Sequence, residues 1–161
     1  MDIKAAYTKL SGLDLSRPMQ YLRERMGYSD PELLEEVREE YVRYMSLVAA
    51  HPDMTLPTCK EVDDLWHAHL LCTHQYLEMC GAIGAGFIHH NPCLSSDAGT
   101  IVGSYNRDTL GLYRAQFGEP HPFWTADQEL CAGDRDYCNS VFFDQKNMAA
   151  ALGERQTHAA Q

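Results

Sequence analysis

The chain has 161 residues, 45% of them apolar, which is the size of one ordinary globular domain able to bury a core without disulfides. A net charge of -10 with only 13 basic residues opposes binding to nucleic acid or to an anionic membrane, because both need clustered lysine and arginine. No stretch approaches the roughly 20 apolar residues of a membrane span, and the first residues lack the apolar core of a signal peptide. We therefore expect a cytoplasmic protein with reduced cysteines.

Helix boundary signals predict the elements of the first third of the chain. Ser16, shortly before a proline, is typical of a helix start, and Gly27 is typical of its end. An Asp-Pro pair at positions 30 and 31 predicts a second helix that runs to about Ala50. We expect its charged run, Glu35–Glu40, to form the solvated face.

A histidine-rich helix is predicted next. Thr58 and Glu61 form a capping box, so this third helix should begin near Cys59 and end around Cys80, ahead of three glycines. The His-His-Asn-Pro sequence at positions 89–92 is typical of an extended turn.

The second half carries fewer signals. Ser96 can cap a fourth helix that stops at Gly118, and Thr125–Gln128 forms a second capping box. A short apolar cluster at 141–143 follows, and we expect residues 145–161 to fray.

These signals together indicate the fold class. Every strong boundary is a helix cap, and no alternating run of strand type exceeds four residues. We therefore predict an all-α fold: a single compact helical domain over residues 1–161, with its core at about 12–130 and five or six helices packed around the central His-rich helix.

Residues able to bind a metal ion are concentrated in and after the third helix. Imidazole, thiolate and carboxylate groups are the side chains that ligate transition metals. At about 100° per residue, His69 lies on the apolar inward face with Trp66, whereas His67 lies opposite with Asp63. The two histidines of W-H-x-H therefore cannot both bind one ion from a regular helix.

Two arrangements stay open at this point. Either His69 points into the core and meets the returning pair His89 and His90, or His67 forms a carboxylate–imidazole site with Asp63. Adjacent residues of an extended segment point apart, so at most one of the paired histidines should join a site. We expect His69 to be buried and neutral in either case.

The motifs of this region resemble those of a known family. The strings VDDLWHAHLLCTHQYLEMC and FIHHNP, followed by YNRDTLGLYRAQFGEPHPFW, are similar to the glycine-rich domain-containing protein-like family, a largely uncharacterised group. The resemblance covers roughly Glu39 to Trp124. It marks signature positions without established catalytic roles, namely Asp63, Trp66, His67, His69, Thr73, Tyr76, Cys80, His89 and His90.

Two hypotheses about function follow. The first is a small His-rich metalloprotein, a metal-dependent oxidoreductase or tailoring enzyme acting on a small molecule or peptide. Its candidate ligands for iron, copper or zinc are Asp63, His67, His69, His89 and His90. The alternative is a metal-free protein-interaction module in which the histidines are structural.

Overall fold

The computed structural model describes residues 1–91, 105–125 and 139–143. The α-helices are α1 (Ile3–Ser11), α2 (Ser16–Arg25), α3 (Pro31–Ala50), α4 (Lys60–Leu71), α5 (Thr73–Ala82) and α7 (Leu110–Phe117). A π-helical turn, η2 (Tyr105–Thr109), leads into α7, and a 3-10 turn, η3 (Pro122–Trp124), follows it. Two strands, β1 (Phe87–Asn91) and β2 (Asn139–Phe143), complete the described elements.

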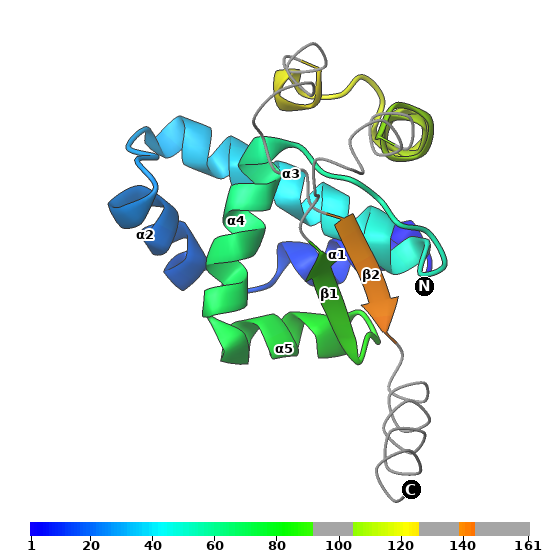
Figure 1. The fold of residues 1–161 in the computed structure, drawn as a ribbon, viewed down its shortest axis with the longest axis horizontal. Coiled ribbons are helices and arrows are strands. Elements are labelled where there is room, and N and C mark those ends of the chain that lie inside the picture. The colour runs from blue at the N-terminus through cyan, green and yellow to red at the C-terminus, as the bar shows by residue number, and fades with distance from the viewer. Residues whose placement is uncertain (92–104, 126–138, 144–161) are drawn as a thin grey trace, which may run out of the picture.

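The helices form the compact helical domain that the sequence predicts. The longest helix, α3, packs against α1, α2, α4 and α7, and α4 also contacts α2 and α5 (Figure 1). None of the helices in the described ranges has both the length and the hydropathy of a membrane span. The predicted signals at Ser96, Thr125–Gln128 and the tail 145–161 depend on residues outside the described ranges.

The predicted bounds of α3 are confirmed, but its charged run is not wholly solvated. Asp30 caps the helix by accepting from the Glu32 amide at 2.9 Å, and the helix ends at Ala50. Glu40, however, is only 2% exposed. Its carboxylate is buried because it has several donors: Tyr113, Arg43 and the indole of Trp124 all hydrogen-bond to it. A buried charge needs such partners, so Glu40 anchors α7 and η3 to α3.

The predicted third helix is divided into two. The backbone turns at Cys72, where ψ is 59°, and the Cys72 amide bonds the carbonyl of His69 at 2.9 Å. The helix α4 begins at Lys60, and its N-cap residue is Cys59 and not the predicted Thr58. Because the helix breaks at Cys72, the helical period places side chains on the faces of α4 only as far as Leu71.

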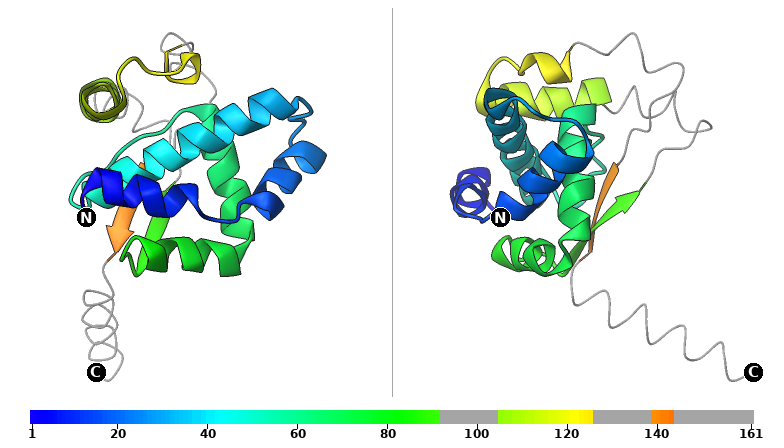
Figure 2. Two further views of the ribbon diagram at one scale, coloured as in Figure 1. Left: turned by 180° about the vertical axis from the view of Figure 1, so that it is seen from behind. Right: turned by 90° about the vertical axis from the view of Figure 1, so that its left-hand side faces the viewer.

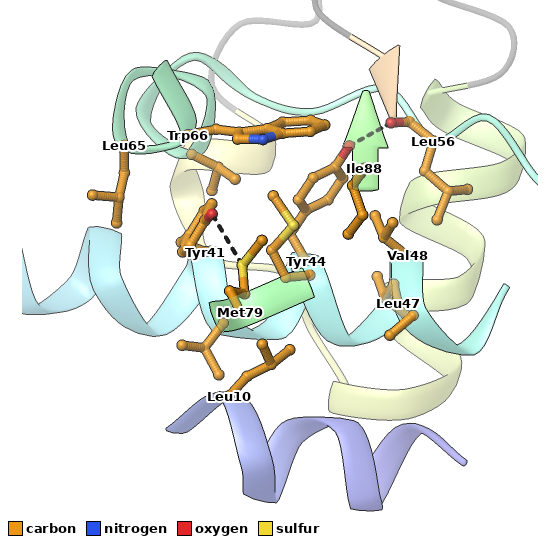
Figure 3. Close-up of a cluster of buried hydrophobic side chains, with 14 of the residues drawn as sticks. Leu10, Tyr41, Tyr44, Leu47, Val48, Leu56, Leu65, Trp66, Met79 and Ile88 are labelled. Atoms are coloured by element: carbon orange, nitrogen blue, oxygen red, sulfur yellow. Dashed lines mark hydrogen bonds between the residues drawn. The ribbon is translucent and has the colours of Figure 1, made fainter. Parts of the chain in front are cut away.

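The core holds α4 against α3. Figure 3 shows Tyr44 of α3 donating its hydroxyl to the Leu56 carbonyl at 2.6 Å, with the indole of Trp66 above it. Side chains from α1, α3, α4, α5 and β1 meet here, among them Leu10, Tyr41, Leu47, Val48, Leu65, Met79 and Ile88. Each fully buried side chain of this size contributes about 1.5–3 kcal/mol, so the position of α4 is firmly set.

The His-His-Asn segment forms a strand where the sequence predicts only an extended turn. β1 pairs antiparallel with β2, and His90 is opposite Ser140 in the register. The two strands lie side by side on one face of the helices (Figures 1 and 2). Local sequence could not reveal this pairing, because the two strands are separated by nearly fifty residues along the chain.

A matched pair of glycines tests the backbone of the α7 region. Gly118 ends α7 with a φ of +85°, whereas Gly111 lies within the helix with open space around its Cα hydrogen. We expect Gly118→Ala to lower the free energy of unfolding by about 1 kcal/mol, because an L side chain is strained at positive φ. Gly111→Ala should raise it by up to about 1 kcal/mol, through better helix propensity. Urea denaturation measures both, and equal effects of the same sign would contradict this account.

Candidate metal centre

Three ligand-type side chains meet where α4 contacts β1. Asp63 and His67 lie one turn apart on the same face of α4, and His90 comes from β1. One ligand atom from each lies within 4.8 Å of the others. Asp63 Oδ2 is 3.2 Å from His67 Nδ1, and Asp63 Oδ1 is 3.0 Å from His90 Nε2. The carboxylate therefore contacts both imidazoles, one through each oxygen.

Two of these atoms are buried and lack a regular hydrogen bond. The side chains of Asp63 and His90 are 7% and 5% exposed. Asp63 Oδ1 and His90 Nε2 face each other as a polar contact of 3.0 Å, but the contact is not aligned as a regular hydrogen bond, and neither atom has another such bond among the described residues. A cation bound by both atoms would replace this contact with two ligand bonds.

The electrostatics keep the carboxylate ionised. Burial alone raises the pKa of Asp63, but the adjacent imidazoles of His67 and His90 outweigh it and hold that pKa below its usual value. In turn, the carboxylate of Asp63 raises the pKa of His67 against the opposing effect of burial. An ionised carboxylate is the form that binds a metal ion.

Aromatic contacts fix the ring of His90. Its imidazole is stacked on the indole of Trp66, with 4.2 Å between ring centroids and 30° between ring planes. The centroid of the His67 ring lies 4.3 Å from that of the His90 ring. His67 itself is the open side of the group, because its side chain is 49% exposed.

His69 is not part of this group. As predicted, it is buried, at 1% exposure, and it faces the core away from His67. The hydroxyl of Tyr41 and Nδ1 of His69 share a hydrogen bond of 2.8 Å, and Tyr76 packs edge-on against the imidazole. Burial lowers the pKa of His69 to about 4, so the ring is neutral at pH 7.

His89 is also outside the group. It precedes His90 on β1 and therefore leaves the opposite face of the strand, where it is exposed and contacts the ring of Phe87. Of the five predicted ligands, the structure thus brings together Asp63, His67 and His90. This group includes the pairing of His67 with Asp63, which was one of the two arrangements left open by the sequence, and adds His90 from the strand.

The nearby thiol does not offer a further ligand. Cys80 on α5 is fully buried, and that burial raises the pKa of its thiol. A protonated, buried thiol is neither a good nucleophile nor a metal ligand. Among the described residues, no cysteine takes part in the candidate metal group.

Two contacts of the site escaped sequence reasoning. The sequence predicts that Trp66 and Tyr76 are ordinary core aromatics, yet the indole of Trp66 is stacked directly on the imidazole of His90. The alternation of side chains along β1 could have indicated the contact with His90. Apolar Ile88 and His90 are two residues apart, so they leave the same face of a strand.

Comparisons with protein-family models, with curated proteins and with solved structures found no match to this chain. The family resemblance of its motifs therefore stays a prediction.

Proposed function

We propose that Asp63, His67 and His90 bind one divalent transition-metal ion and that the protein is a metal-dependent enzyme. The observation that carries the proposal is a pair of buried ligand atoms, Asp63 Oδ1 and His90 Nε2, that face each other at 3.0 Å and make no regular hydrogen bond among the described residues. Two ligands that each lie about 2.1 Å from one ion are separated by about 3–4 Å. The pair thus has a ligand-to-ligand distance suited to a shared ion, and the half-exposed His67 can complete the set.

The donor set supports iron or zinc. Two imidazoles and one carboxylate are typical of mononuclear iron(II) oxygenases, and a similar set occurs in catalytic zinc sites. Copper(I), which favours thiolate ligands, is less well supported, because no described cysteine belongs to the group.

Three protein ligands leave coordination positions for water and substrate, which distinguishes catalytic from structural metal sites. A metal ion bound there would supply Lewis acidity or redox chemistry to a small molecule or peptide. The protein's own contribution is a buried carboxylate and a stacked imidazole on one side, with the exposed edge of His67 on the other. An oxidoreductase or tailoring activity is the reaction class that we propose for this open site.

Metal analysis of the untagged wild-type protein tests the proposal. We expect about one equivalent of iron or zinc after anaerobic reconstitution. Free metal at about 100 times its dissociation constant should stabilise the fold by about 2.7 kcal/mol, which corresponds to a rise of roughly 5–10 °C in Tm. A chelator should reverse that rise. Sub-stoichiometric metal together with a Tm indifferent to metal and chelator would instead favour the metal-free interaction module.

A further inference from the structure

A single buried hydroxyl joins the two segments that carry the candidate ligands. Tyr76 of α5 is 1% exposed. Its hydroxyl donates to the backbone carbonyl of Ile88 on β1 at 2.5 Å. The same oxygen accepts a hydrogen bond of 3.0 Å from the indole N–H of Trp66 on α4. Because a hydroxyl can donate one bond and accept others, both contacts form at once. Tyr76 thus ties α4 to β1.

Both contacts act on His90. Ile88 precedes His90 by two residues, so fixing the Ile88 carbonyl fixes the strand segment from which the imidazole projects. The indole of Trp66 is the surface on which that imidazole is stacked. One hydroxyl therefore restrains the backbone of the ligand and the plane of its ring.

We infer that Tyr76 and Trp66 are positioning residues that hold His90 Nε2 toward Asp63 and thereby set the affinity of the metal centre. This inference rests on the proposed metal centre. Distances between a metal and its ligands vary by only about 0.2 Å in well-formed sites, so a small shift of the imidazole weakens binding. Residues that orient a ligand without touching the metal typically change metal affinity by about 10–100-fold when replaced.

Two tyrosine variants make a matched comparison. Tyr76→Phe removes the hydroxyl and keeps the ring. Tyr44→Phe is the control, since Tyr44 is equally buried, donates to the Leu56 carbonyl at 2.6 Å and has its ring centroid 5.7 Å from that of Trp66. Each variant loses one buried hydrogen bond to a backbone carbonyl, and Tyr76→Phe also leaves the Trp66 N–H without its acceptor, so Tyr76→Phe should lose somewhat more thermal stability than Tyr44→Phe.

The measurement is competition of each protein with a chromophoric chelator for Co²⁺. We expect Tyr76→Phe to bind Co²⁺ about 10–100-fold more weakly than wild type, with an altered cobalt absorption spectrum at saturation. Tyr44→Phe should bind within about twofold of wild type and keep its spectrum. Trp66→Phe keeps an aromatic ring and loses the N–H, so it should weaken Co²⁺ binding as Tyr76→Phe does. If Tyr76→Phe does not fold, Trp66→Phe takes its place in the comparison.

The outcomes separate this inference from the proposed function. If wild type does not bind Co²⁺, the metal centre itself fails. If wild type binds but Tyr76→Phe, or Trp66→Phe in its place, matches Tyr44→Phe in affinity and spectrum, the metal centre stands and the positioning role is overturned.

Discussion

Replacing His90 by alanine is expected to weaken metal binding by more than about 100-fold, because a lost ligand costs more than a lost orienting residue. The imidazole is buried against Trp66, and its Nε2 is 3.0 Å from Asp63 Oδ1, so its loss removes one of the three ligand-type side chains that the structure brings together. Isothermal titration with Zn²⁺ measures the effect. The neighbouring variant His89→Ala is the control, because His89 is exposed on the other face of β1. It should bind Zn²⁺ within about twofold of wild type.

A second matched pair lies on the helices. His67 is four residues after Asp63, and His74 is four residues before Glu78, so both are histidines with a carboxylate one turn away. Only His67 is near the buried group, whereas the His74 side chain is 88% exposed. His67→Ala should therefore lower Zn²⁺ affinity and His74→Ala should not. Equal losses from these two variants, or from His89→Ala and His90→Ala, would rule out the three-residue site.

His69 is expected to make the fold sensitive to acid. Its pKa is lowered from 6.5 to about 4 in the folded protein, so the native state keeps the ring neutral while the unfolded chain takes up a proton below about pH 6.5. The stability that this difference contributes is fully present above pH 6.5. It declines as the pH falls through that range, and it is lost below about pH 4. The pKa difference corresponds to about 3 kcal/mol, an order-of-magnitude figure.

His69→Asn isolates this effect. Asparagine can place a polar atom near the position of Nδ1 and keep the hydrogen bond with the Tyr41 hydroxyl, but it does not titrate. We expect the variant to lose about 3 kcal/mol less than wild type between pH 7 and pH 4, when both are unfolded by urea with chelator present. The chelator removes any contribution from metal release. Parallel pH profiles for the two proteins would show that His69 is not the group responsible.

Local sequence was sufficient where a structure is made from neighbouring residues. Asp30 and Pro31 start α3 because a cap and a fixed φ need no distant partner, and Gly118 ends α7 because it adopts a positive φ. The opposite placement of His67 and His69 likewise follows from the helical period, and the structure confirms it within α4.

Tertiary structure decided what depends on distant segments. The break at Cys72 is absent from the boundary signals of the chain, and the burial of Glu40 requires donors from α7 and η3, more than seventy residues later. A carboxylate in a charged run looks solvated until those donors are in place, because only they offset the cost of removing it from water.

The candidate metal centre divides in the same way. Asp63 and His67 were recognisable as a pair from their spacing of four residues on one helix. The choice of His90 over His89 came from the pairing of β1 with β2 and from the packing of its ring on Trp66. The spacing of Ile88 and His90 indicates that they share one face of a strand, but it does not identify what that face meets. Strand pairing and ring stacking join residues far apart in the chain, and their free energy is gained only when the whole domain has folded.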